Sequence, residues 1–87
     1  MKRLFYILFF ITSFVSAQNP EAFFKEANDL YKVGRYEEAI ALYKKIENQK
    51  LTSSELYYNL GNCYYKLNQV AETIYNYEKA LLLDPLN

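Results

Sequence analysis

Few side chains in this 87-residue sequence could carry out covalent or acid–base chemistry. It contains no histidine and a single cysteine, Cys63. A lone cysteine, with no histidine to activate it and no second cysteine to pair with, is typical of a small buried apolar residue rather than of a nucleophile. The same shortage excludes a zinc site built from histidine and cysteine ligands.

The other candidates for chemistry are acidic residues and one turn. Four glutamates have lysines close by in the sequence, which favours solvated helix surfaces over paired acid–base groups; they are Glu37, Glu38, Glu72 and Glu78. The turn "VGR" at 33–35 lacks the glycine-rich run and the Lys-Ser/Thr of a phosphate-binding loop. We therefore expect a protein that is not an enzyme, with no cofactor, no metal and no small-molecule substrate. The balanced charge, ten acidic and ten basic residues, gives no reason to expect nucleic acid as a partner.

The stretch "ELYYNLGNCYYKL" at 55–67 holds four tyrosines, a glycine and the cysteine. Its residues follow the i, i+3, i+4, i+7 spacing of a helix face, at Tyr57, Leu60, Gly61 and Tyr64. Further apolar stripes occupy its other faces, and a helix that is apolar on nearly every side belongs between other helices. The stretch therefore predicts a packed helix in which Gly61 lets two backbones approach closely.

The sequence matches itself at an offset of 34 residues without a gap. The coinciding pairs include Phe23 with Tyr57, Ala27 with Gly61, Tyr31 with Tyr65, Lys32 with Lys66, and Tyr43 with Tyr77. Two units, 20–53 and 54–87, fill the sequence after Asn19. Each unit has the spacing of two helices, and no strand pattern competes. We therefore predict an all-α fold of two tandem helical hairpins.

Residues suited to helix starts stand where the helices should begin. Asn19 followed by Pro20 suits an N-cap and a first helical position. In "TSSE" at 52–55, Thr52 and Glu55 have the spacing of a capping box, in which a hydroxyl and a carboxylate satisfy free amide groups reciprocally. These residues predict that the first helix of each unit begins at the start of that unit.

Residues suited to helix ends appear at equivalent places in the two units. Gly34 and Asn68 are residue types that tolerate the left-handed conformation just after a helix. Asp84-Pro85 is expected to end the last helix, which should cover about 70–83.

The second unit resembles the tetratricopeptide repeat, a helical hairpin of 34 residues. The pattern of that family is present at Tyr57, Leu60-Gly61, Tyr64, Thr73, Tyr77 and Pro85. The first unit resembles it more loosely, in "YKVGRYEEAIALY" at 31–43, and departs from it at Glu26, Leu30, Ile46 and Leu51. The resemblance implies an α-solenoid. Thr73 replaces the alanine usual where the two helices cross, so we expect a looser crossing or a hydroxyl bonded to its own helix.

In this family the first helices of successive repeats line a concave groove that holds a protein or peptide. The resemblance places six residues in that groove: Phe24, Asn28, Tyr31, Tyr58, Asn62 and Tyr65. The two asparagines match those with which some relatives hold a peptide backbone or a terminal carboxylate. Phe24 stands where such a carboxylate clamp has a lysine, which favours a more apolar ligand. The alternative is that the six residues pack against one another or against a neighbouring repeat.

The first residues predict export. Lys2 and Arg3 precede an apolar run at 4–15, and "VSA" at 15–17 provides small residues before a cut, as in a secretory signal peptide over 1–17. The run is short for a membrane span, although an uncleaved anchor is the alternative. The sequence also resembles the N-terminal part of aerotolerance-operon proteins, which carry tetratricopeptide repeats, a membrane segment and an SH3-like domain. We expect a periplasmic protein in a membrane-associated complex.

The last expected helix carries apolar residues that the sequence gives nothing to cover. They are Ile74, Tyr77, Leu81 and Leu82. Because repeat units bury their faces against neighbours, we expect either that the array continues beyond this sequence or that the protein self-associates through this face. The sequence thus supports two functions. The first is a scaffold that binds a partner in a tyrosine-lined groove. The second is an assembly element whose repeats stack while the groove stays empty.

Overall fold

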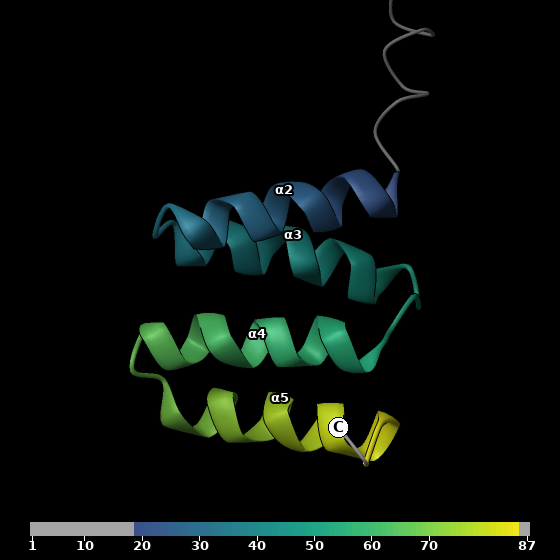
Figure 1. The fold of residues 1–87 in the computed structure, drawn as a ribbon, viewed down its shortest axis with the longest axis vertical. Helices are drawn as coiled ribbons and strands as arrows, with labels where there is room; N and C mark the ends of the chain where they lie inside the picture. The colour runs from purple at the N-terminus through teal and green to yellow at the C-terminus, as the bar shows by residue number, and fades with distance from the viewer. Residues whose placement is uncertain (1–18, 86–87) are drawn as a thin grey trace, which may run out of the picture.

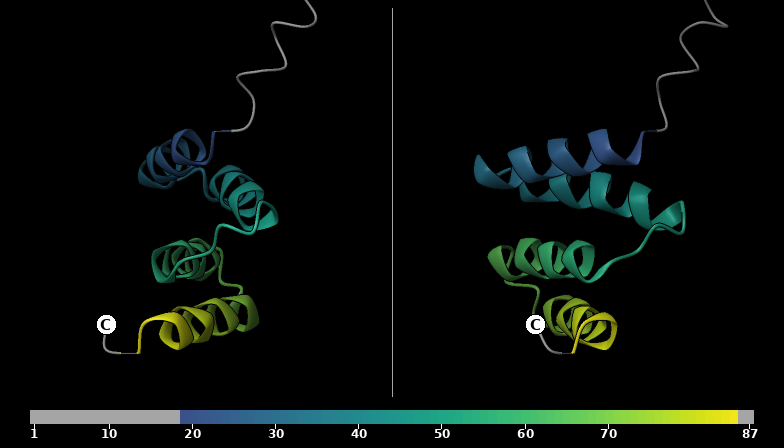
Figure 2. Two further views of the ribbon diagram at one scale, coloured as in Figure 1. Left: turned by 90° about the vertical axis from the view of Figure 1, so that its right-hand side faces the viewer. Right: turned by 45° about the vertical axis from the view of Figure 1, so that its right-hand side comes forward.

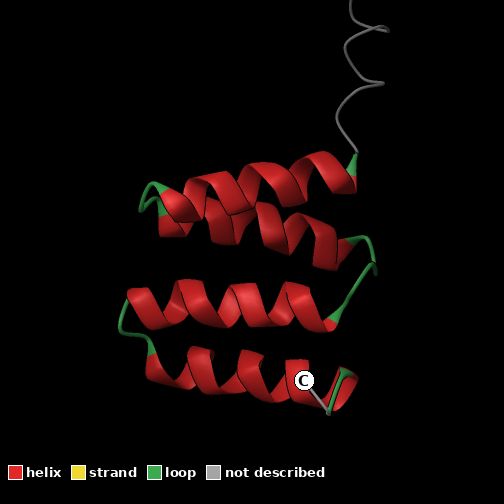
Figure 3. Cartoon of the chain, viewed as in Figure 1, coloured by secondary structure: helices red, strands yellow, loops and turns green. Residues whose placement is uncertain are grey.

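A computed structural model describes residues 19–85 of the chain, which form four helices and no strand (Figures 1 and 3). The first pair is α2 (Pro20–Lys32) and α3 (Tyr36–Asn48). The second pair is α4 (Ser54–Lys66) and α5 (Val70–Leu83). The all-α prediction is therefore confirmed, and one helix pair lies within each of the two units. The signal peptide expected over 1–17 falls outside the described residues.

The four helices stack in chain order as two antiparallel hairpins (Figure 1). Helices α2 and α4 lie toward one side of the stack, and α3 and α5 are displaced toward the other (Figure 2). Helix α4 packs against its own partner α5 and also against α3 of the preceding hairpin. This position between two helices explains why α4 is apolar on several faces.

Side-chain caps define the starts of α2 and α4, the first helices of the two hairpins. The Asn19 side chain accepts hydrogen bonds from the amides of Glu21 at 3.0 Å and Ala22 at 3.4 Å, as expected. The capping box expected from Thr52 is wrong by one residue. Ser53 takes the extended N-cap conformation, and its hydroxyl accepts from the Leu56 amide at 3.0 Å, so α4 begins at Ser54.

The first helix of each repeat ends in a left-handed residue, as Gly34 and Asn68 predicted. Their φ angles are 83° and 60°. In each case the next amide reaches back to close the last turn, from Arg35 to the Leu30 carbonyl at 2.9 Å and in the same way after α4. Helix α3 ends in the same manner, but its left-handed residue is Lys50, with φ 64°. Asp84 caps the end of α5, as expected.

The core lies between the hairpins and inside each of them. It consists of Ala27, Ala39, Tyr43, Ile46, Leu56, Tyr57, Leu60, Cys63 and Ala80. The expected burial of Cys63 is confirmed, since its side chain is fully covered. Thr73 occupies the place of Ala39 in the second repeat and is also buried. Its hydroxyl donates to the Gln69 carbonyl at 2.7 Å, so the hydroxyl is bonded to its own helix, as one of the two expectations stated.

Helix α5 keeps much of its apolar surface exposed. The large apolar residues exposed on it are Val70, Ile74, Tyr75, Leu81, Leu82 and Leu83. Of the four residues expected to be uncovered, Ile74, Leu81 and Leu82 are exposed, whereas Tyr77 is half-buried because its ring packs on Tyr58. Within residues 19–85, no helix is long and apolar enough to cross a membrane.

Candidate functional site

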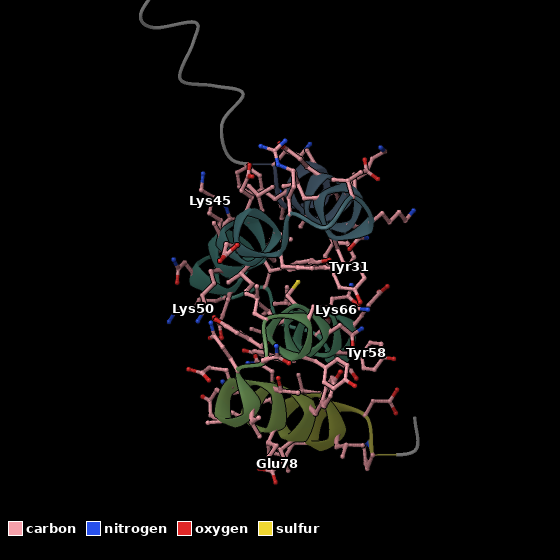
Figure 4. The ribbon with its side chains drawn as sticks, turned by 90° about the vertical axis from the view of Figure 1, so that its left-hand side faces the viewer. Tyr31, Lys45, Lys50, Tyr58, Lys66 and Glu78 are labelled. Carbon is pink, nitrogen blue, oxygen red and sulfur yellow. The ribbon has the colours of Figure 1, made fainter. Side chains whose placement is uncertain are left out.

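The six residues expected to line a groove lie on α2 and α4, the first helices of the two repeats. Phe24, Asn28 and Tyr31 belong to α2 and are half-buried. Of the equivalent α4 residues, Tyr58 and Tyr65 are more open, at 53% and 65% exposed, while Asn62 is half-buried like Asn28. Figure 4 shows Tyr31 and Tyr58 on the same side of the stack. The two helices therefore present corresponding side chains on a shared surface.

Each asparagine in this set is bonded to a tyrosine of the second helix in its own repeat. The Tyr77 hydroxyl donates to Asn62 Oδ1 at 2.5 Å. The Tyr43 hydroxyl donates to Asn28 Oδ1 in the same way. Asn28 and Asn62 are related by the 34-residue offset, and so are Tyr43 and Tyr77. The same tyrosine–asparagine hydrogen bond therefore occurs in both repeats. The residue types were visible in the sequence, but their pairing was not predicted.

An aromatic residue one turn before each asparagine completes this unit. The rings of Phe24 and Tyr43 meet edge to face with centroids 5.7 Å apart, and those of Tyr58 and Tyr77 are 5.8 Å apart at an interplanar angle of 31°. Such ring pairs add to the stability that burial provides. The tyrosine of the second helix is thus held by its ring and by its hydroxyl.

Burial raises the pKa of the Tyr43 hydroxyl. It also raises the pKa of the Tyr77 hydroxyl, although Tyr77 is less buried than Tyr43. Both hydroxyls therefore stay protonated and act as donors at neutral pH. Because each asparagine oxygen accepts from a tyrosine, the amide group is fixed in one orientation. Within residues 19–85 the Nδ2 groups of Asn28 and Asn62 donate no hydrogen bond, so they are available to a ligand acceptor such as a peptide carbonyl.

A cavity of about 270 Å³ joins the two repeats on this surface. It is lined by Asn28, Tyr31, Lys32, Tyr43, Asn59 and Asn62. The structure therefore brings together three of the six expected residues, Asn28, Tyr31 and Asn62. Asn59 was not predicted, and its Nδ2 donates to Asn28 Oδ1 at 3.3 Å across the repeat boundary. Three amide side chains beside one cavity form a polar surface that can hydrogen-bond a peptide backbone.

The other three expected residues lie outside that cavity. Phe24 packs on Tyr43 in the first repeat. Tyr58 lines a larger cavity of about 630 Å³ between α4 and α5, with Ser54, Tyr77, Ala80, Leu81 and Asp84. Tyr65 lines a hollow of about 170 Å³ at the other end of the same helix pair. The two expected tyrosines of α4 therefore line hollows of the second repeat rather than the cavity between the repeats.

The opposite side of the repeat boundary is closed by a charged and aromatic cluster. The Tyr57 hydroxyl donates to Glu47 Oε2 at 3.0 Å, which ties α4 to α3. Lys79 Nζ lies 4.7 Å from the centroid of the Tyr57 ring and 4.9 Å from that of Tyr75. The same ammonium stands 4.0 Å from Glu47 Oε2. This cluster joins α3, α4 and α5 across the repeat boundary.

The described residues hold no arrangement typical of a catalytic or metal site. Burial raises the pKa of the Cys63 thiol to about 11, which keeps it protonated and unreactive at neutral pH. Among residues 19–85 there is no group of three or more histidine, cysteine, aspartate or glutamate side chains that could hold a metal ion. What the arrangement offers is hydrogen bonding and aromatic contact.

Comparison with known families gives two matches that overlap along the chain. The family described as tetratricopeptide repeat matches residues 54–87. The family described as TPR repeat matches residues 27–68. Together the matches extend from residue 27 to residue 87. No curated protein matches the chain.

Proposed function

Because this chain belongs to the tetratricopeptide repeat family, we propose that it is an exported, non-enzymatic scaffold that holds a partner on the surface formed by α2 and α4. Repeats of this family generally mediate protein–protein interaction. One observation carries the proposal. In both repeats a tyrosine hydroxyl donates to the oxygen of an asparagine, and the two asparagines line one cavity between the repeats.

The partner that suits this surface is an extended, largely apolar peptide segment. Its backbone carbonyls would accept from the Nδ2 groups of Asn28 and Asn62, which border one cavity. Its apolar side chains would cover the rings of Tyr31, Tyr58 and Tyr65, and the tyrosine hydroxyls would still reach water or polar groups. Tyrosines suit this task because a large ring is buried at low conformational cost.

The first 17 residues support the location of this scaffold. Their basic start, apolar run and small residues before the cut are features of an exported protein. A periplasmic scaffold of tetratricopeptide repeats that is part of a membrane-associated complex agrees with these features and with the resemblance to aerotolerance-operon proteins. Fractionation of cells that express the chain with a C-terminal tag tests this location. A signal confined to the cytosol would contradict it.

The binding surface is tested by selecting peptides on the chain from a random peptide library and measuring their affinity for variants. Asn62→Ala and Tyr65→Ala should each weaken binding by about tenfold or more, since each removes a side chain that contacts the peptide in this proposal. Tyr75→Ala is the matched control, because Tyr75 is also an exposed tyrosine but lies on α5. Equal effects of Tyr65→Ala and Tyr75→Ala, or no effect of Asn62→Ala, would contradict the proposal.

A second candidate is an assembly element that associates through its last helix while the α2–α4 surface stays empty. The exposed apolar side chains of α5 favour it. Sedimentation of the full chain distinguishes the two functions. A concentration-dependent dimer that Leu82→Glu dissociates would favour assembly, and a monomer would favour the scaffold.

A further inference from the structure

The outer surface of the second repeat is the counterpart of a surface that is covered in the first. This surface, here named the end face, consists of Tyr58 and Tyr65 on α4 and Ile74, Tyr77 and Leu81 on α5. Two hollows of about 630 and 170 Å³ lie along it. In the first repeat the equivalent surface of α3 packs against α4.

The packing of α4 on the first repeat lowers the exposure of residues whose equivalents in the second repeat are open. Tyr43 is only 1% exposed under α4, whereas Tyr77 on the end face is half-buried. Ile74 and Leu81 are 51% and 52% exposed, while the residues at the same places in the first repeat are half-buried. The end face therefore has the shape of a helix-binding surface whose helix is absent among the described residues.

We propose that the end face binds a basic amphipathic helix of a partner protein, in the orientation in which the first repeat binds α4. The apolar spacing of that partner follows from α4 itself. Leu56, Leu60 and Cys63 of α4, at i, i+4 and i+7, are buried in the core that α4 shares with α3. A partner helix with apolar residues at these spacings fills the hollows between α4 and α5.

A hydrogen-bond donor is expected one turn into the partner helix. On α4 this donor is Asn59, whose Nδ2 donates to Asn28 Oδ1 beside the tyrosine hydroxyl already bound there. The equivalent acceptor on the end face is Asn62 Oδ1, which accepts only from Tyr77 within residues 19–85. An amide oxygen accepts two hydrogen bonds, so Asn62 can take one more.

Charge indicates that the partner helix is basic. The first repeat has Lys44 and Lys50 where the second repeat has Glu78 and Asp84, and Asp84 lines the larger hollow of the end face. Figure 4 shows Glu78 pointing away from the stack at the end formed by α5. The one lysine of α5, Lys79, is already engaged with Glu47 and two tyrosine rings. A helix with lysine or arginine in its first turn complements these acids.

A second copy of this chain is a poorer occupant. If its α2 replaced α4, the places of Leu60 and Cys63 would be taken by Glu26 and Asp29. Asp29 is paired with Lys25 at 3.0 Å on an exposed surface, so this end of the molecule is polar. If two end faces met each other, Glu78 and Asp84 of one copy would approach the same acids of the other. Such like-charge contacts oppose association.

The test is fluorescence anisotropy with a labelled, helix-stabilised peptide of residues 54–66 carrying Glu55→Lys, titrated with the full 87-residue chain. We expect saturable binding that Ile74→Glu weakens by about tenfold or more, because it places a charge in the apolar contact. Val33→Glu is the control, since Val33 is equally an exposed apolar residue but lies at the end of α2. Binding should also weaken as salt is raised.

A peptide of residues 20–32, of the same length, serves as the second control and should not bind. Ile74 is exposed, so its substitution should leave the helical circular dichroism signal unchanged. The proposal is overturned if the first peptide shows no saturable binding, or if both peptides bind alike. It is also overturned if sedimentation shows a dimer that Ile74→Glu dissociates, because the occupant is then a second copy. Tyr58 and Tyr65 belong to both proposed surfaces, but Ile74 lies on α5, so the effect of Ile74→Glu reports on the end face and leaves the α2–α4 surface intact.

Discussion

Gly61 lies directly against the ring of Tyr77, so closely that a Cβ atom at Gly61 would stand 2.5 Å from Tyr77 Cδ1. The sequence suggested that Gly61 lets two backbones approach. The structure shows instead that it makes room for an aromatic side chain of α5. The first repeat accommodates Ala27 at the equivalent position, fully buried. The second repeat therefore packs its tyrosine more closely on its first helix.

Replacing Gly61 with alanine should lower the free energy of unfolding by up to about 2 kcal/mol. The added methyl forces Tyr77 out of place, which costs about 1–3 kcal/mol and outweighs the gain of about 1 kcal/mol in helix propensity. Urea unfolding followed by circular dichroism measures the change. In a Tyr77→Ala background the same substitution should be stabilising, because the clash with the ring is gone and only the gain in helix propensity remains. A stabilising effect in the presence of Tyr77 would show that the ring moves aside freely.

Lys50→Gly should stabilise the protein by about 1 kcal/mol. Lys50 has a φ of 64°, a left-handed conformation that costs a residue with a Cβ atom about 1–2 kcal/mol and costs glycine little. Lys50→Ala is the control, since it removes the charged side chain and retains the Cβ, and it should give no such gain. The measurement is the midpoint of thermal unfolding. An equal rise in both variants would mean that the lysine side chain, rather than its backbone, is unfavourable.

The hydrogen bond between Tyr43 and Asn28 should contribute more to stability than its counterpart between Tyr77 and Asn62. Tyr43→Phe should lower the free energy of unfolding by about 1 kcal/mol, since Tyr43 is fully buried, and Tyr77→Phe should lower it by less. Chemical denaturation of the two single variants measures the difference. A double-mutant cycle with Asn28→Ala isolates the pair, and strictly additive effects would contradict a direct bond.

Stability should fall as the pH rises from 9 to 11, in part because of Cys63. Burial raises the pKa of this thiol to about 11 from an ordinary value of 9.0, so the folded state holds the proton more tightly than the unfolded state. The resulting stabilisation is complete below pH 9 and is lost as the pH approaches 11. Burial also raises the pKa of Tyr43 and Tyr77, which adds a loss of the same sign above pH 10.

Urea unfolding at several pH values checks this prediction. The decline between pH 9 and 10 should be smaller in Cys63→Ala than in the parent chain, although that variant is less stable at every pH because it leaves a cavity. The thiol should also react slowly with a disulfide reagent at pH 8 until the protein is unfolded. Rapid reaction of the folded protein would show that Cys63 is accessible.

Two kinds of feature could be predicted from the sequence. Helix faces follow from local spacing, since residues such as Tyr57 and Leu60 must share a side once the chain is helical. Turns follow from the backbone freedom of single residues, and Gly34 and Asn68 are left-handed where the repeat placed them. The position of the α4 cap was harder to predict. Thr52 and Ser53 both carry a hydroxyl, and only the path of the loop from α3 decides which of them lies at the helix start.

In the predicted groove, too, local spacing determined some features and tertiary packing determined others. Its six residues were chosen because they share the faces of two helices, and the structure places them on α2 and α4. Which of them meet at one cavity depended on the angle between hairpins. Contacts between the hairpins, such as the hydrogen bond from Tyr57 to Glu47, were not predicted from the repeat positions. Asn59 was missed for this reason, since its partner Asn28 lies 31 residues away.

The sequence by itself determined the all-α fold, the two hairpins and most helix ends, because these depend on interactions within a few residues along the chain. Only the tertiary structure decided which asparagine oxygens accept hydrogen bonds and which ring lies on Gly61. Those features join side chains fifteen or more residues apart. Their distances depend on how helices cross, and the crossing is a property of the whole packed core rather than of any local stretch.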